Sequence, residues 1–405
     1  MKSKILLVSL VILSSLALSG VLFAENIPND TISRSSLVQL SGNSNMYSGE
    51  QMFQVAGYPT LVRFVKGDPS KPTVVLIPGN NSLARIFYGY PGCNPKDFLE
   101  YWLHKSGYSV LAISYPMDNA VYPNPTKYAQ LTLADFAAQV SVVTKYFMTR
   151  NNLSNNVILT MWSGGGRPVV DISNAFKKTN IHLDYGISLA ATPPMMGVAG
   201  LNQPAISTNF PVDKNGYLAN VMLQNLEEQI HVENILNNAI IIPENIYEAQ
   251  FVGASPIQFY NPSIKWNGQK IVADTKGLKN NMCYSNFTNY PIVAAFSGNN
   301  QIDALHELLG VPSWTLISQE SVYLNHLNLS ISGLSSSQWR LLSNTIKAMP
   351  AQLTYTVTGS HFFFIGEKGA KQTVANIAKV GGNIKKIRSV VNNKEFAAPN
   401  SWLIK

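Results

Sequence analysis

The run Val157-Ile-Leu-Thr-Met-Trp-Ser163-Gly-Gly-Gly166-Arg-Pro decides the fold class. It predicts a short apolar strand, a turn of small residues and the start of a helix. A serine in so tight a strand-to-helix turn exposes its hydroxyl above the sheet, as in the pattern G-x-S-x-G. Gly165 fits the last position of that pattern, whereas Met161 stands where glycine is usual. Glycine-rich turns also cradle phosphates or simply end strands, so both interpretations stay open for this stretch alone.

Apolar strands and amphipathic helices alternate on both sides of this stretch. Continuous apolar runs predict buried strands at 73–77 and 108–116, and such runs are typical of a covered parallel sheet. A helix from Thr132 to about Arg150 can be capped by its first residue, and a further strand is expected at 183–191. Further along, a loop is expected from residue 313 to a helix at about 338–349, and a closing helix at about 370–379. This alternation predicts an α/β fold with a mostly parallel, doubly wound sheet.

The strand–helix rhythm is interrupted between about residues 195 and 289. We interpret this block as a largely helical cap or lid over the carboxyl edge of the sheet, where ligands bind in open α/β sheets. A helical insertion without a gating role is the alternative. The predicted core then comprises 45–194 and 290–405, and the Ser/Asn-rich residues 25–44 are expected to form a flexible lead-in.

Residues 1–24 predict a secretory signal peptide. Two lysines precede a long apolar run, and Ala24 is a small residue directly before a polar segment, as cleavage sites require. An uncleaved membrane anchor is the competing interpretation, since the run is almost long enough to span a bilayer. We therefore expect an exported protein, periplasmic or extracellular, after cleavage behind Ala24.

The formal net charge is +8 over 405 residues. The basic residues form no stripe interleaved with aromatic side chains, so a nucleic-acid partner is not expected. The local excess at 385–388 is interpreted as a solvated helix face, and weak contact with an anionic membrane surface is the alternative. The sequence leaves the oligomeric state open.

Two cysteines, Cys93 and Cys283, both lie in loop-like sequence. Export into an oxidising space would allow them to form a disulfide, and two free thiols are the alternative. The spacing of cysteines and histidines does not fit a structural zinc site. Nucleotide fingerprints are missing as well, so neither a metal nor an organic cofactor is expected.

Serine chemistry needs an imidazole and a carboxylate at the same sheet edge as the hydroxyl. Of the six histidines, His361 is the one that follows a predicted strand within two small residues. Asp303 is the first acid in the loop after the strand at 291–296, and simple capping of the helix that follows is its alternative role. Ser163, Asp303 and His361 thus occur in the nucleophile, acid, base order.

Two backbone N–H groups must also face the developing oxyanion. The candidates are Gly164, directly after the serine, and Asn80 or Asn81 in the turn that follows the strand at 73–77. A turn that merely ends this strand is the alternative interpretation.

Five motifs taken together resemble the α/β-hydrolase superfamily over roughly Thr73 to Phe364. They are Ile-Pro-Gly (77–79), Met-Trp-Ser-Gly-Gly (161–165), Ala-Thr-Pro-Pro (191–194), Phe-Ser-Gly-Asn-Asn (296–300) and Gly-Ser-His-Phe (359–362). The resemblance implies Ser163 as nucleophile, His361 as base and Asp303 as acid. Two positions depart from the family pattern: Met161 replaces the first glycine of the elbow, and Gln301 stands where the acid usually lies.

The resemblance implies an exported serine hydrolase, a carboxylesterase or lipase, that cleaves a lipid or small acyl ester through an acyl-enzyme. A peptidase or a thioesterase of the same fold is the nearest alternative. A catalytically silent binding protein is another, and the departures at Met161 and Gln301 favour it.

Overall fold

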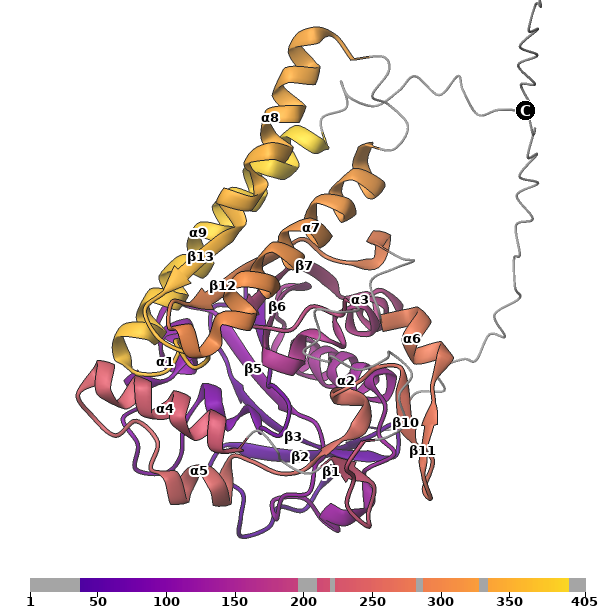
Figure 1. Ribbon diagram of the computed structural model, residues 1–405, viewed down its shortest axis with the longest axis vertical. Helices are drawn as coiled ribbons and strands as arrows, with labels where there is room; N and C mark the ends of the chain where they lie inside the picture. The colour runs from indigo at the N-terminus through magenta and orange to yellow at the C-terminus, as the bar shows by residue number, and fades with distance from the viewer. Residues whose placement is uncertain (1–36, 196–209, 219–222, 282–286, 328–333, 393–405) are drawn as a thin grey trace, which may run out of the picture. The chain divides into compact units, whose positions relative to one another are not determined.

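A nine-stranded sheet organises the fold (Figure 1). The computed structural model describes residues 37–195, 210–218, 223–281, 287–327 and 334–392. The strand order is β1-β2-β3-β5-β4-β6-β7-β12-β13. Antiparallel pairing at one end of the sheet involves β1 (Val38–Leu40), β2 (Glu50–Val55) and β3 (Tyr58–Val65). The remaining strands run parallel: β5 (Ser109–Ser114), β4 (Thr73–Ile77), β6 (Asn156–Trp162), β7 (His182–Leu189), β12 (Val293–Gly298) and β13 (Thr354–Val357). The predicted mostly parallel sheet is confirmed.

Both faces of the sheet are buried, because its central strands direct apolar side chains to both sides. In β4, Val74 and Leu76 pack into one core, and Val75 and Ile77 pack into the other. The first core receives α1 (Leu99–Lys105), α8 (Ser336–Leu353) and α9 (Glu367–Val391). The second core receives α2 (Leu133–Asn151), α3 (Val169–Lys178) and α7 (Val311–Val322). This is the doubly wound arrangement that continuous apolar strands indicate.

Helix α2 begins where its sequence predicts. Thr132 Oγ1 accepts a hydrogen bond from Asp135 N at 3.1 Å, and Asp135 Oδ2 accepts one from Thr132 N at 3.0 Å. This reciprocal capping box satisfies two N–H groups that the first turn leaves unpaired.

The cap lies between β7 and β12. Its described helices are α4 (Leu223–Asn237), α5 (Glu244–Gln250) and α6 (Thr275–Asn281). Two small antiparallel sheets, which the sequence did not predict, accompany them: β8 (Tyr217–Leu218) with β9 (Ser255–Pro256), and β10 (Ile264–Trp266) with β11 (Ile271–Ala273). The segment before β9 bridges to Ser82 and Asp118, which lie beyond the carboxyl ends of β4 and β5. The cap thus contacts the predicted edge of the sheet.

Three expectations about elements need correction. Residues 38–40 form β1 on the edge of the sheet, although 25–44 was expected to be a flexible lead-in. Helix α7 occupies part of a predicted loop, and α9 runs from Glu367 to Val391, well beyond the predicted 370–379. The predicted signal peptide, 1–24, lies outside the described residues. Within the described ranges, no helix combines the length and the hydropathy needed to cross a membrane.

Candidate active site

Ser163 stands at the carboxyl end of β6, in the turn that leads through η4 (Ser163–Gly166) toward α3. Its φ of +50° lies in the left-handed region, where a residue with a Cβ is strained by about 1–2 kcal/mol. Residues on either side of Ser163 are buried, whereas Ser163 itself is partly exposed. A Cβ added at Gly79 would lie 2.6 Å from Ser163 Cβ, so the neighbouring turn requires glycine. Backbone strain at a partly exposed serine in a tightly packed turn is typical of a functional position.

His361 and Asp303 reach the same edge from two neighbouring parallel strands. Asp303 ends η7 (Gln301–Asp303) after β12, and His361 follows β13. Asp303 Oδ2 lies 3.1 Å from His361 Nδ1, and both residues are buried. Gln301, at the position where the family's acid is usual, is exposed. The geometry therefore pairs His361 with Asp303.

Asp303 is held in its ionised form. Burial alone would raise the pKa of Asp303, but the charge of His361 and the hydrogen bonds from His306 and His361 lower this pKa well below its ordinary value. A hydrogen-bonded carboxylate of this kind can fix the tautomer of an imidazole and stabilise its positive charge.

His306 is a site residue that the sequence reasoning missed. It lies one turn after Asp303, at the start of the π-helical turn η8 (His306–Gly310). Its Nδ1 lies 2.6 Å from Asp303 Oδ1, and its Nε2 lies 3.3 Å from Thr192 Oγ1. Burial, followed by the neighbouring charge of His361, lowers the pKa of His306 below its ordinary value. The spacing Asp303-x-x-His306, which places two side chains on one helix face, is the signal that could have found it.

A cavity of about 270 Å³ brings the predicted residues together. Ser163, Asp303, His361, Asn80, Asn81 and Gly164 all contribute to its lining, with His306, Thr192, Arg167, Tyr260 and residues of the cap helix α4. Within the part of the chain that the structure describes, Ser163 Oγ makes no hydrogen bond to His361, whose Nδ1 contacts Asp303. Such bonds are often long in enzymes without substrate and tighten only in the complex.

One of the predicted oxyanion donors uses its backbone N–H for a hydrogen bond to the cap. The N–H of Asn81 donates to Ser255 Oγ of the cap at 2.6 Å, so the prediction that this amide faces the site is wrong. The cap holds Asn81 in this orientation, because Asn81 O accepts a hydrogen bond from Gly253 N at 3.1 Å and Asn81 Nδ2 donates one to Gly253 O at 2.9 Å. Asn80 packs directly against Gly164, where an added Cβ would overlap Asn80 Oδ1. Gly164 and Asn80 remain the candidate donors.

The cap helix α4 holds the loop that carries His361. Gln229 Oε1 accepts a hydrogen bond from His361 N at 2.9 Å. Glu233 Oε1 accepts hydrogen bonds from Ser360 N at 2.5 Å and from Ser360 Oγ at 2.8 Å. On the other side, Trp162 Nε1 donates to His361 O at 3.1 Å. The backbone of residues 360–361 is therefore fixed between the cap and β6.

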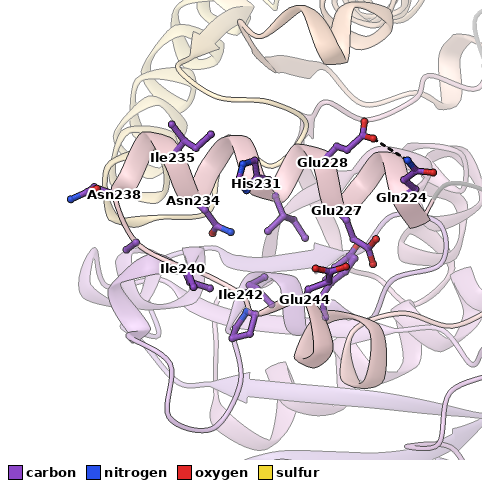
Figure 2. A pocket seen from close by; sticks show the side chains of 14 residues that line it. Gln224, Glu227, Glu228, His231, Asn234, Ile235, Asn238, Ile240, Ile242 and Glu244 are labelled. Carbon is purple, nitrogen blue, oxygen red and sulfur yellow. Dashed lines mark hydrogen bonds between the residues drawn. The ribbon is translucent and has the colours of Figure 1, made fainter.

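A second, larger cavity of about 1000 Å³ lies on the cap, between α4 and residues 238–247 (Figure 2). Glutamates and isoleucines line it, and none of the predicted site residues does. Glu227, Glu244 and Glu248 bring carboxylate oxygens within 4.8 Å of one another there. Burial, followed by the charges of Glu248 and Glu244, raises the pKa of Glu227.

Asp303, His306 and His361 also bring potential metal-ligating atoms within 4.8 Å of one another. The mutual hydrogen bonds account for this convergence, so we assign no metal ligand in this site. Cys93 is partly buried, and its Sγ accepts a hydrogen bond from Tyr90 N at 3.3 Å. Cys283 lies outside the described residues, so its pairing with Cys93 stays a prediction.

No protein-family model and no curated protein matches the sequence. A candidate lipase from Sulfolobus solfataricus is similar in structure, with 11% sequence identity and a TM-score of 0.45 over 86% of this chain and 99% of that chain. A highly thermostable carboxyl esterase from Bacillus coagulans has 8% identity and a TM-score of 0.43, over 88% and 98% of the two chains. A thermophilic esterase from Thermogutta terrifontis has 11% identity and a TM-score of 0.42, over 87% and 99%.

These TM-scores lie below 0.5 and add no weight to the assignment of the fold, which follows from the chain's own topology. After an antiparallel start, β5 lies between β3 and β4, and β6, β7, β12 and β13 then continue the sheet in chain order. The strained serine follows β6, the acid follows β12 and the histidine follows β13. The chain has the α/β-hydrolase fold.

Proposed function

We propose that the protein is a serine hydrolase that cleaves a carboxylic ester through an acyl-enzyme. The observation that carries the proposal is the left-handed backbone of Ser163 in one cavity with His361, whose Nδ1 is hydrogen-bonded to Asp303. The roles of the three side chains follow from their chemistry, because an imidazole near the hydroxyl can act as its general base at neutral pH.

In the proposed reaction, Ser163 Oγ attacks the acyl carbon while His361 Nε2 takes the hydroxyl proton. Asp303 stabilises the imidazolium that forms. The negative charge on the acyl oxygen is stabilised by the backbone N–H groups of Gly164 and Asn80. The tetrahedral intermediate collapses, and His361 returns the proton to the departing alcohol. Water, activated by the same imidazole, then releases the acid and restores Ser163.

The experiment that tests this proposal combines covalent labelling with activity. A fluorophosphonate probe should modify Ser163, and Ser163→Ala should lose both labelling and ester hydrolysis. Ser154→Ala, in the loop before β6 and remote from the cavity lining, is the matched control and should keep both. Retention of hydrolysis by Ser163→Ala would exclude the serine mechanism. Absence of label on the folded protein would favour a catalytically silent binding protein.

The substrate class is part of the proposal. Leu226, Ile302 and Leu305 supply apolar surface to the cavity, which suits an acyl group. A panel of acyl esters of graded chain length, with a thioester and a peptide amide of the same acyl group, separates an esterase from a thioesterase or a peptidase. Faster turnover of the amide than of the ester would contradict the ester assignment.

We also propose that the protein is exported after cleavage behind Ala24. The sequence pattern of residues 1–24 supports this. Mass spectrometry of the protein recovered outside the cytoplasm should give an N-terminus at Glu25. Recovery of the intact N-terminus in a membrane fraction would support an uncleaved anchor instead.

A further inference from the structure

We propose that His306 is a positioning residue of this site, which holds the Asp303 carboxylate in the orientation that His361 needs. The inference rests on the proposed function and deepens it. It gives a role to His306, a histidine that is not the proposed nucleophile, acid or base.

The carboxylate of Asp303 is shared between two imidazoles. Its Oδ1 lies 2.6 Å from His306 Nδ1, and its Oδ2 lies 3.1 Å from His361 Nδ1. Asp303 and His361 are 5% and 3% exposed, so bulk water has little access to the carboxylate. The contact to His306 is the shorter one, and it therefore restrains rotation of the carboxylate more strongly than the contact to His361 does.

The hydrogen-bond network assigns the proton on His306. An ionised carboxylate can only accept, so His306 Nδ1 must donate to Asp303. Burial, followed by the electrostatic effect of a protonated His361, lowers the pKa of His306, so this imidazole is neutral and its Nε2 is an acceptor. Thr192 Oγ1, 3.3 Å from that Nε2, is then the donor.

Thr192 connects this network to the turn of the proposed nucleophile. Its backbone N–H donates to Ser163 O at 2.8 Å, while its hydroxyl meets His306 Nε2. A continuous chain of contacts thus runs from Ser163 through Thr192 and His306 to Asp303. It ties the residue that carries the nucleophile to the residue that orients the base.

A neutral imidazole suits this place because of the charge that forms beside it. The ring centroids of His306 and His361 are 4.5 Å apart. During the proposed reaction His361 becomes an imidazolium, and a second positive charge at that distance would oppose its formation. A neutral donor restrains Asp303 without adding such a charge. An arginine or lysine at position 306 would restrain the carboxylate but would repel the imidazolium.

The test compares substitutions that differ in where they can place an N–H donor. The amide nitrogen of asparagine takes the place of Nδ1, whereas that of glutamine takes the place of Nε2. His306→Phe and His306→Gln should lower kcat by about tenfold to 100-fold with KM within about twofold, because a hydrogen bond to a charged group is lost. His306→Asn should stay within about threefold of the wild type.

A spectroscopic measurement checks the same point without turnover. The downfield proton resonance of the hydrogen bond between His361 and Asp303 should weaken in His306→Phe and return in His306→Asn. His104→Phe, on α1 with its Nε2 bonded to Lys66 O, is the matched control and should change neither readout. If His306→Phe fails to fold, the comparison of the Gln and Asn variants decides, since both keep a polar side chain.

Two outcomes overturn the inference: kcat of His306→Gln within twofold of the wild type, or equal losses in the Asn and Gln variants with folding intact. Ser163→Ala separates this failure from failure of the proposed function. If Ser163→Ala is inactive while all His306 variants keep the kcat of the wild type, only the proposed role of His306 is wrong. If Ser163→Ala stays active, the proposed function itself is wrong.

Discussion

Changing Glu233 to glutamine is expected to stabilise the protein at pH 8 and to affect its stability much less at pH 5. Glu233 lies on α4, is 1% exposed and accepts two hydrogen bonds from Ser360. Burial raises the pKa of this carboxyl from 4.5 to about 7, although both hydrogen bonds act in the opposite direction. Glutamine keeps the accepting oxygen and removes the charge.

The sign follows from proton binding. Between about pH 4.5 and pH 7, the folded protein holds a proton on Glu233 that the unfolded chain releases, so the free energy of unfolding falls as the pH rises. The stability contributed by the protonated group is present below pH 4.5 and is lost as the pH passes about 7. Integrated from pH 5 to pH 8, this loss is about 2.5 kcal/mol. Over the same pH range, the free energy of unfolding of Glu233→Gln should therefore rise by about 2.5 kcal/mol relative to that of the wild type.

Urea unfolding followed by tryptophan fluorescence, at pH 5, 6, 7 and 8, measures this difference. Glu228→Gln on the exposed side of the same helix is the matched control, and its effect should stay below about 0.5 kcal/mol at every pH. A difference between Glu233→Gln and the wild type that is constant from pH 5 to pH 8 would refute the reasoning. It would mean that the buried carboxyl stays ionised in the folded protein throughout this range.

Three further predictions concern packing and capping. Gly79→Ala should abolish most ester hydrolysis, because its Cβ would lie 2.6 Å from Ser163 Cβ; near-normal activity would contradict this. Arg85→Leu should lower the free energy of unfolding by about 3–5 kcal/mol, since the buried Glu50, 2.8 Å from Arg85 Nε, loses its ion pair. Adding Glu50→Gln should recover part of that loss, and urea unfolding that shows a loss below about 1 kcal/mol would argue against it. Thr132→Ala should cost about 1 kcal/mol by the same measurement while Thr132→Ser costs little, and equal losses in both variants would exclude the capping box as the cause.

The sheet could be predicted because its signal is local. Each residue of β4 is buried, and a short continuous apolar run is typical of a strand that is covered on both faces. Helix α7 was not predicted as a helix. It continues from the π-helical turn η8 across Gly310 and Pro312, two residue types with low helix propensity. Helix α9 continues through Gly381 and Gly382 because its apolar side chains are buried against the core, and packing outweighs the low helix propensity of glycine.

The site could be predicted as far as topology determines it. Carboxyl ends of parallel strands meet at one edge, so Ser163, Asp303 and His361 could be expected there from their places after three strands. His306 had only a weak local signal, its spacing from Asp303. The roles of Gln229 and Glu233 had none, because their partners lie more than 120 residues away in the sequence. Such contacts depend on how the cap packs, which no local pattern encodes.

The contacts of α4 imply that this helix belongs to the fixed frame of the site. Separating it from the core would break the three hydrogen bonds that Gln229 and Glu233 accept from residues 360 and 361, each worth about 1 kcal/mol net. It would also expose Leu226 and Ile230, now buried in the core, at about 1.5–3 kcal/mol each. Together these terms approach the whole stability of a typical domain. Because a movement of α4 would release the histidine loop as well as open the cavity, we expect α4 to stay docked during the proposed reaction, and we expect a variant without the cap to lose the position of His361.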